Sequence, residues 1–334
     1  MAGIDWNEIS SKSNGGTELL CRRLENSFDS SLLNEFQIIP SRIRELDKNK
    51  YRIYWVHDLP HDFEVQKALQ QDHNSGGWAR FHKIVFVSYH QMNGCIERYG
   101  IPHSKCLVIQ NGIFPLEKRT SFPREDDTVK IIYHTTPHRG LGILATVFDN
   151  LWKKNKKIHL DVYSSYSIYG WNDRDEQFKD LFKFLDEHEG ITNHGAVSNE
   201  EVRKAVSASD IFAYPSIWPE TSCLALIEAM SAGLECVHSS LGALPETSSN
   251  WTSMYPHHEN PSVHAGIFHR VLESAIDSVR NKNDDHRRDA MAAYASSVYD
   301  WNSRAKAKWK SLFESVLAEK ASKEIPGGVF RYER

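Results

Sequence analysis

Two glutamates, Glu220 and Glu228, are separated by seven residues around a predicted helix start. An apolar run and a turn with two prolines precede them, which is typical of a strand that leads into a helix. Thr221 or Ser222 can cap this helix at its N-terminus, and Gly233 is placed to end it. A helix start after a strand presents unpaired N–H groups and the positive end of a dipole, so this stretch can bind a phosphate.

The two carboxylates suit an extended ligand with hydroxyl groups at both ends and negative charge in the middle. Eight helical residues rise about 12 Å, so Glu220 and Glu228 can contact opposite ends of such a ligand. Carboxylates accept hydrogen bonds from paired sugar hydroxyls, and a hydroxyl of Thr221 or Ser222 adds a donor. A nucleotide-diphosphate-sugar has this form. On spacing alone, an amphipathic helix with one solvated glutamate, and a second glutamate in a turn, is the simpler explanation.

Three other places along the chain carry groups suited to the same kind of ligand. Gly15 and Gly16 precede a predicted helix, and glycines let a backbone approach a ligand closely. His57 ends a predicted strand, where open α/β sheets place ligands, and His61 is its rival. Arg139 lies in a strand-to-helix loop and can bind a diphosphate bidentately. Taken singly, each has a plainer explanation as a loop glycine, a partly buried histidine or a solvated arginine.

The composition is that of an ordinary globular protein of two-domain size. The chain has 334 residues, of which 40% are hydrophobic and 25% charged. A formal net charge of -4 does not favour nucleic acid as a partner. The five cysteines lack the spacing of metal ligands, so we expect reduced thiols and a cytoplasmic location. We expect no signal peptide and no transmembrane segment, because no apolar run has the required length.

The central stretch also resembles a known family. Glu220, seven residues and Glu228, followed by a run that ends at Gly233, resemble the E-x7-E signature of retaining GT-B glycosyltransferases of the "glycosyl transferases group 1" type. The stretch Ser240–Glu246 resembles that family's loop after the next strand. The resemblance covers residues 190–246 with matching order and spacing. It therefore favours a nucleotide-sugar site over an ordinary amphipathic helix as the explanation of this stretch.

The resemblance implies the GT-B fold, in which two Rossmann-like α/β domains face a cleft. Strands and helices alternate along both halves of the chain, which supports this architecture independently. Only residues 1–6 precede the loop region that contains the glycine pair, so we expect a very short, displaced or missing first strand. The expected parts are an N-terminal acceptor-side domain (1–116), a C-terminal donor-side domain (117–300), and a helix that packs back on the N-terminal domain with a loose tail (301–334).

The resemblance further implies transfer of a hexosyl unit, with retention, from a nucleotide-sugar to an acceptor hydroxyl. Glu220 and His57 are expected at the transferred sugar, as the catalytic pair, and Glu228 at the ribose. The family uses no cofactor or catalytic metal, and a UDP- or GDP-sugar is the expected donor. The acceptor is an unidentified glycan, lipid or protein, and peripheral membrane contact stays open. The residues expected to bind the donor are Gly15, Gly16, Arg139, Thr221, Ser222, Cys223 and Glu228.

One departure from the family pattern concerns the diphosphate. The family carries a basic pair in the strand-to-helix loop, and Arg139 matches its second member. The first member is replaced by His134 or lost. Two alternatives follow: a GT-B enzyme of another reaction, such as a nucleotide-sugar 2-epimerase, and a binding protein that has lost turnover.

Overall fold

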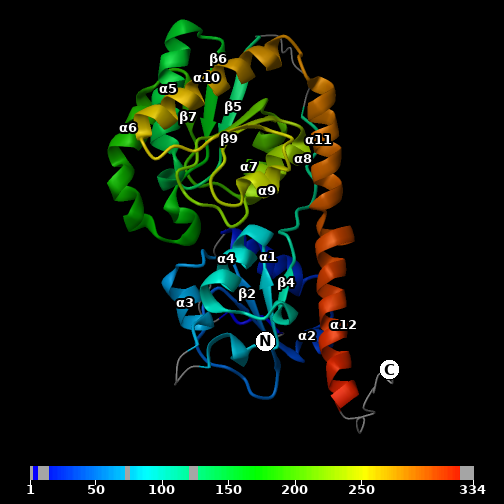
Figure 1. The fold of residues 1–334 in the computed structure, drawn as a ribbon. Coiled ribbons are helices and arrows are strands. Elements are labelled where there is room, and N and C mark those ends of the chain that lie inside the picture. The colour runs from blue at the N-terminus through cyan, green and yellow to red at the C-terminus, as the bar shows by residue number, and fades with distance from the viewer. Residues whose placement is uncertain (1–2, 7–14, 72–75, 120–126, 324–334) are drawn as a thin grey trace, which may run out of the picture.

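A computed structural model describes residues 3–6, 15–71, 76–119 and 127–323 of the chain. These residues form two α/β domains, each built on its own parallel sheet, and a long C-terminal helix runs beside the N-terminal domain (Figure 1). The expected architecture of two Rossmann-like domains is therefore confirmed. The last part of the predicted loose tail, residues 324–334, lies outside the described residues.

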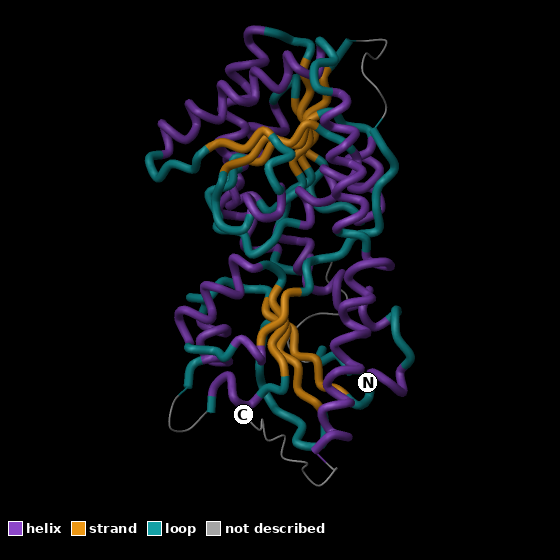
Figure 2. Tube along the Cα trace, turned by 45° about the vertical axis from the view of Figure 1, so that its right-hand side comes forward, coloured by secondary structure: helices purple, strands orange, loops and turns teal. Residues whose placement is uncertain are grey.

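The N-terminal domain contains a four-stranded parallel sheet with the order β1-β2-β3-β4 (Figure 2). Its strands are short apolar runs in which successive side chains are buried, as in a parallel sheet covered on both faces. A single parallel bridge joins Ile4 to Ile38 of β1, and no longer strand precedes β1 among the described residues, so the expectation of a very short first strand is confirmed. The strands are β1 (Phe36–Pro40), β2 (Tyr51–Val56), β3 (Lys83–Phe86) and β4 (Cys106–Val108).

The helices of this domain begin and end as local chemistry dictates. The Ser88 hydroxyl accepts a hydrogen bond from the Gln91 N–H at 3.0 Å and caps α4, as predicted. Gly100 ends α4 with a φ of 64°, a left-handed conformation that favours glycine. The helices are α1 (Gly16–Glu25), α2 (Ser30–Leu33), α3 (Phe63–Leu69) and α4 (Tyr89–Tyr99), with short 3₁₀ turns η1 (Gly77–Arg80) and η2 (His103–Lys105).

The C-terminal domain contains a six-stranded parallel sheet with the order β10-β9-β8-β5-β6-β7. The chain leaves β5 in one direction and later returns to β8 on its other side, so the strand order reverses between these two strands. Ligands bind at the carboxyl ends of strands at such a point. The strands are β5 (Val129–Tyr133), β6 (Ile158–Val162), β7 (Ile191–Asn193), β8 (Ile211–Tyr214), β9 (Glu235–Ser239) and β10 (Ser253–Tyr255).

Three predicted elements of this domain differ from the structure. The amphipathic helix expected over 172–189 begins as a 3₁₀ segment, because the Asp175 carboxylate accepts the Tyr166 N–H at 2.9 Å and ties the segment to the preceding loop. β10 pairs with β9 inside the expected loop 250–261. α11 begins within the charged turn expected over residues 281–289.

The helices of the C-terminal domain are α5 (Leu141–Lys154), α6 (Lys179–Glu187), α7 (Asn199–Ser207), α8 (Leu224–Ala232), α9 (Leu244–Ser248), α10 (Pro261–Arg280) and α11 (Asp285–Val298), with η3 (Pro137–Arg139), η4 (Tyr166–Tyr169) and η5 (Asn172–Phe178).

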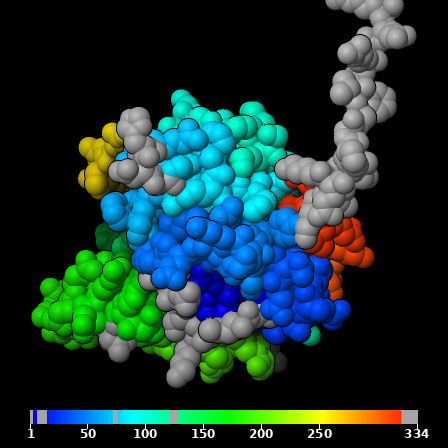
Figure 3. All heavy atoms as spheres, turned by 90° about the horizontal axis from the view of Figure 1, so that it is seen from below, coloured from blue at the N-terminus to red at the C-terminus, as the bar shows by residue number. Residues whose placement is uncertain are grey.

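The chain then crosses back to the N-terminal domain through a π-helical turn, η6 (Trp301–Ala305), and α12 (Lys306–Lys323). The predicted apolar stripe is buried there: Trp309 and Phe313 pack in one core with Phe36 of β1. The Trp301 indole N–H donates to the Ser27 hydroxyl at 2.8 Å. The predicted return of the terminal helix is thus confirmed, and Figure 3 shows α12 in orange-red at the side of the blue N-terminal domain.

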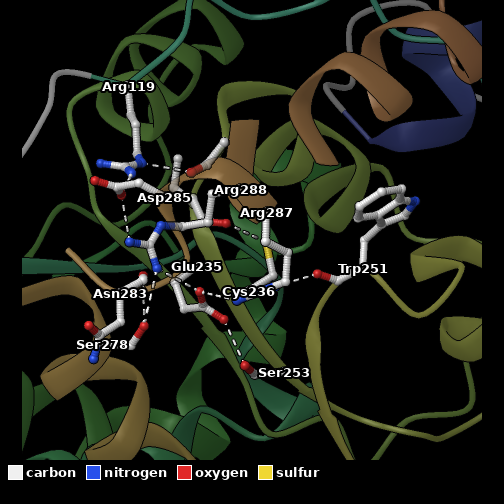
Figure 4. Close-up of polar contacts among 12 residues, drawn as sticks. Arg119, Glu235, Cys236, Trp251, Ser253, Ser278, Asn283, Asp285, Arg287 and Arg288 are labelled. Atoms are coloured by element: carbon white, nitrogen blue, oxygen red, sulfur yellow. Dashed lines mark hydrogen bonds and ion pairs between the residues drawn. The ribbon is translucent and has the colours of Figure 1, made fainter. Parts of the chain in front are cut away.

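A buried ionic network holds the chain between the domains against the C-terminal domain (Figure 4). Glu235 and Arg288 are each 1% exposed and form an ion pair at 3.0 Å. Asp285 joins Arg288 at 2.6 Å to Arg119 at 2.8 Å. Arg119 also donates to the Gly233 carbonyl at 2.7 Å, and Gly233 ends α8 with a φ of 78°. The network therefore fixes the C-terminal end of α8, whose other end faces the cleft.

Hydrogen bonds of Thr221 and Glu246 join the two domains directly. The Thr221 hydroxyl donates to the His57 carbonyl at 2.8 Å. Glu246, at the end of the loop that resembles the family's, accepts the N–H groups of Tyr89 and His90 at 2.9 and 2.8 Å. These N–H groups belong to the first turn of α4, where a carboxylate is favoured by the helix dipole. The contacts set the opening of the cleft between the domains.

Candidate active site

A cleft of about 730 Å³ lies between the two domains, at the end of the C-terminal sheet where the strand order reverses. Both domains contribute to its wall. All of the residues predicted as site residues line it, whereas His61, the rival of His57, does not. The predicted residues on the cleft are Gly15, Gly16, His57, Arg139, Glu220, Thr221, Ser222, Cys223 and Glu228.

Glu220 is held from several directions. Its side chain is buried, and its Oε1 lies 2.6 Å from Arg139 Nη1 and accepts the Tyr214 hydroxyl. Its carbonyl accepts the Ala243 N–H at 2.7 Å. At Gly242 the backbone has a φ of 65°, and a Cβ would lie 2.5 Å from the Glu220 backbone. The loop after β9 therefore needs glycine there in order to brace Glu220.

Arg139 reaches Glu220 because two loops at the strand ends pack tightly together. A Cβ on Gly140 would lie 2.2 Å from the Pro215 carbonyl oxygen, and Gly140 has a φ of 120°. Burial lowers the pKa of Arg139, but the Glu220 carboxylate, together with Tyr214, Tyr169 and Cys223, raises it, and its pKa lies above its ordinary value. The Arg139 Nε atom is buried without a partner among the described residues. The guanidinium thus stays cationic and keeps a donor for a ligand.

The helix that carries Glu228 starts later than predicted. α8 begins at Leu224, and its N-cap is Cys223, which makes no side-chain cap bond. The prediction that Thr221 or Ser222 caps it is wrong, because the Thr221 hydroxyl instead binds the His57 carbonyl of the other domain. The N-terminus of α8 still faces the cleft, since Leu224 and Ala225 line it. Burial raises the pKa of the Cys223 thiol well above its ordinary value, so the sulfur is uncharged.

Glu228 is also paired with an arginine. Its side chain is buried, and its Oε1 lies 2.6 Å from Arg203 Nη1 of α7. Arg203 donates in turn to the Phe114 carbonyl at 2.7 Å, so its position is fixed by the chain between the domains. Burial lowers the pKa of the nearby Arg23 of α1, and the Glu228 charge opposes that effect. No pattern in the sequence indicated the Arg203–Glu228 pair, since the two residues lie on separate helices.

Two histidines on the cleft are neutral at physiological pH. Burial lowers the pKa of His57 to about 3 and that of His134 to about 4. The Nε2 atom of each ring is buried without a partner among the described residues. The Trp55 ring packs on His57 with centroids 4.6 Å apart. His134 thus stands in place of the first member of the expected basic pair as an uncharged imidazole, which leaves Arg139 as the cation of that pair.

Among the described residues, no group of three or more His, Cys, Asp or Glu side chains is arranged to hold a metal ion. In the same part of the chain, no helix combines the length and apolar character needed to cross a membrane.

The family follows from a comparison of the sequence. Residues 115–284, just over half of the chain, match the family model described as "Glycosyl transferases group 1". The chain belongs to this family. The matched segment contains both glutamates and Arg139, so the resemblance seen in the short motif extends over most of the C-terminal domain.

A curated relative and solved structures agree with this family. One subunit of the phosphatidylinositol N-acetylglucosaminyltransferase of Homo sapiens is 24% identical over 165 residues, which are 49% of this chain and only 33% of the human protein. A glycosyltransferase from Rickettsia africae has a TM-score of 0.60 at 16% identity, with 93% of this chain and 84% of that chain covered. The Anabaena protein HepE, in complex with UDP-glucose, has a TM-score of 0.60 at 14% identity, covering 90% and 82%. These structures identify the fold as GT-B.

Several residues of this glycosyltransferase cleft were not predicted as site residues. Glu18 and Asp58 line the N-terminal wall together with Arg42. An aromatic rim follows β6, where Tyr166 stacks on His138 with centroids 5.4 Å apart. The position of Glu18, three residues after Gly15, is the one signal in the sequence that points to the first of these. The other residues on the aromatic rim are Tyr169, Trp171 and Trp218.

Proposed function

We propose that the protein is a retaining hexosyltransferase, which moves a hexosyl unit from a UDP- or GDP-sugar to an acceptor hydroxyl. Membership of the glycosyl transferases group 1 family supports glycosyl transfer in general. The observation that carries the proposal is the placement of Glu220 and Glu228 on one cleft, each buried and held at 2.6 Å by an arginine. Such fixed carboxylates are suited to bind the hydroxyl groups of a sugar and of a ribose.

In this proposal the donor lies along α8. Glu220, just before the helix, accepts hydroxyls of the transferred sugar, and Glu228, inside the helix, accepts the ribose hydroxyls. The diphosphate lies between them, where the dipole of α8 and the backbone N–H groups of Thr221, Ser222 and Cys223, which precede the helix, favour an anion. Gly15 and Gly16 close the site from the other domain.

The transfer step needs stabilisation of the charge that develops on the leaving diphosphate. The bond between the anomeric carbon and the phosphate oxygen breaks, the acceptor oxygen takes its place on the sugar, and the proton of the acceptor hydroxyl passes to the departing diphosphate. Arg139 and the N-terminus of α8 are the groups placed to stabilise the departing diphosphate. We propose for this reason that no metal ion is needed. His57, as a neutral imidazole, offers Nε2 to a sugar hydroxyl rather than a positive charge.

The donor and the location of the enzyme are further parts of the proposal. The related fold of HepE holds UDP-glucose, which makes UDP-glucose the first donor to test. The free cysteines, four of them buried, support a cytoplasmic enzyme with reduced thiols.

Substitution of Glu220 tests the proposal directly. Glu220→Ala should abolish turnover while the affinity for the bare nucleoside diphosphate stays within about threefold, because the sugar is the only part of the donor that Glu220 contacts in this proposal. Isothermal titration calorimetry and a coupled assay of diphosphate release measure the two effects. Equal losses of turnover and of diphosphate affinity would argue against the sugar-side role.

The two alternatives give different outcomes in the same assays. A 2-epimerase-like enzyme would convert the nucleotide-sugar without any acceptor, and a binding protein would bind it without turnover. No observation among the described residues favours either alternative over transfer.

A further inference from the structure

Glu228 is held at its side chain and at its backbone. Its Oε1 lies 2.6 Å from Arg203 Nη1, whereas no hydrogen bond to its Oε2 is formed within the described residues. Its carbonyl accepts the Ser231 hydroxyl at 2.8 Å, and the oxygen of that hydroxyl accepts the Leu116 N–H at 3.3 Å. The carboxylate therefore has one oxygen that the protein occupies and one that it leaves for a ligand.

Arg203 is itself fixed by the chain that joins the domains. Its Nη2 donates to the Phe114 carbonyl at 2.7 Å, while its Nη1 holds Glu228. A guanidinium group is planar, so two such bonds made from one group set its direction as well as its position. Arg203 does not line the cleft, although Glu228 does. Its contact with the site therefore passes through the Glu228 carboxylate.

The segment that anchors Arg203 is firmly attached to the C-terminal domain. The Ser207 hydroxyl of α7 donates to the Glu117 carbonyl at 3.0 Å. The Arg119 N–H donates to the Ala232 carbonyl of α8 at 2.8 Å. Phe114 lies in the same segment, so its carbonyl is a fixed point against which the guanidinium can be oriented.

Arg23 is a second cation near Glu228, and it comes from α1 of the N-terminal domain. It lines the cleft; burial lowers its pKa, the Glu228 charge raises it and Arg203 lowers it. Its Nη1 donates to the Gly112 carbonyl at 2.6 Å, and its guanidinium lies 5.2 Å from the centroid of the Phe114 ring. Arg23 forms no ion pair with Glu228 within the described residues. It therefore supplies positive charge nearby without orienting the carboxylate.

We propose that Arg203 is a positioning residue, which directs Glu228 Oε2 at the ribose hydroxyls and thereby sets the preference of the site for an intact ribose. This inference rests on the proposed function, because it takes Glu228 as the ribose contact. A glutamate side chain has several rotatable bonds, and an acceptor that is already held in place loses less conformational entropy when it binds. Without Arg203, the carboxylate keeps its chemistry but loses its fixed direction.

The test compares nucleoside diphosphates with and without the two ribose hydroxyls. Isothermal titration calorimetry measures the Kd of UDP and 2′,3′-dideoxy-UDP, and of GDP and 2′,3′-dideoxy-GDP, and the pair that contains the tighter ligand is used. Because hydrogen bonds to a charged group are among the strong ones, we expect the wild type to bind the ribose form at least about tenfold more tightly than the dideoxy form.

Arg203→Met removes both hydrogen bonds in a side chain of similar length. The preference for ribose should fall below about threefold, while the affinity for the dideoxy form stays within about twofold of the wild-type value, because that ligand has no ribose hydroxyl to lose a contact. Equal weakening of both forms would indicate a general structural defect and would overturn the inference. The matched control is Lys204→Met on the same helix, whose ammonium group pairs with Glu200 at the surface at 2.7 Å, and it should change neither Kd.

Arg203→Lys separates orientation from charge and gives an answer whether or not the methionine variant folds. A lysine keeps the positive charge but has no planar fork to hold the Glu228 carboxylate and the Phe114 carbonyl together, so the preference for ribose should fall at least about threefold. A preference equal to that of the wild type would show that charge alone suffices and would refute the positioning role. A wild-type protein that binds both forms equally, or neither, refutes the proposed function instead, so the two failures are distinguishable.

Discussion

Replacement of Arg139 by alanine tests the electrostatics of the donor side most sharply. Its guanidinium lies 2.6 Å from Glu220 Oε1 and keeps a buried Nε atom without a partner among the described residues. A hydrogen bond between charged groups contributes about 1.5–3 kcal/mol. At 1.4 kcal/mol for each factor of ten, loss of the contact to phosphate should weaken binding of a nucleoside diphosphate by about 10- to 150-fold. Binding of the corresponding nucleoside should change by less than about threefold, because no phosphate is present to lose the contact.

The same substitution leaves the buried Glu220 carboxylate without its cation, and such a loss costs about 3–5 kcal/mol of stability for a fully buried pair. The Arg139 side chain is 26% exposed, so we expect the lower part of that range or less. Two further variants separate stability from binding. Arg139→Lys keeps the charge and should lose less affinity, and Arg139→Ala with Glu220→Gln should recover stability without recovering phosphate affinity. Calorimetry on each variant measures these affinities. An equal loss of affinity for the nucleoside and for the nucleoside diphosphate would refute a contact between Arg139 and phosphate.

The remaining predictions concern the ribose end, the brace of the motif, the return helix and pH. Glu228→Ala should reduce the affinity for nucleosides as well as for diphosphates; an unchanged Kd in calorimetry would exclude a ribose contact. Gly242→Ala should impair turnover in folded protein, because its Cβ would lie 2.5 Å from the Glu220 backbone. The control variant Gly266→Ala, on the open face of α10, should keep its activity. Equal kcat values for the two variants would contradict this prediction. Trp309→Ala should destabilise the N-terminal domain by about 3–5 kcal/mol, since the side chain is fully buried, and urea unfolding measures this. His238 is fully buried, and burial lowers its pKa from 6.5 to about 4. The neutral imidazole therefore contributes its full stability above pH 6.5. This contribution declines as the pH falls from 6.5 towards 4. At pH 5 this residue should cost about 2 kcal/mol, and a thermal midpoint that does not fall between pH 7 and pH 5 would contradict the assignment.

The sequence predicted the parts of the fold that local pattern determines. The apolar runs that became β2, β5 and β8 are strands because a buried parallel strand needs little but apolar side chains. The spacing of Glu220 and Glu228 did not by itself indicate the site, and it was the resemblance over residues 190–246 that favoured a functional interpretation. The apolar stripe indicated that α12 is buried, because apolar residues at helical spacing fall on one face of the helix.

The parts that the sequence missed depend on contacts between distant segments. The helix start was misplaced because Thr221 binds the His57 carbonyl of the other domain, 164 residues away. Arg203 was missed because its pairing with Glu228 arises only when α7 packs against α8. Glu18 was missed because its burial depends on Tyr169, which arrives from the other domain.

The central claim is that this cleft binds a nucleotide-sugar through the paired glutamates. A thermal-shift panel of UDP, GDP, ADP, TDP and their common sugar conjugates, run on the wild type and on Glu228→Ala, tests it most directly. We predict saturable stabilisation of the wild type by the UDP or the GDP series, and at least tenfold weaker apparent binding by the variant. A well-folded wild-type protein that none of these ligands stabilises, or a variant that responds like the wild type, would contradict it.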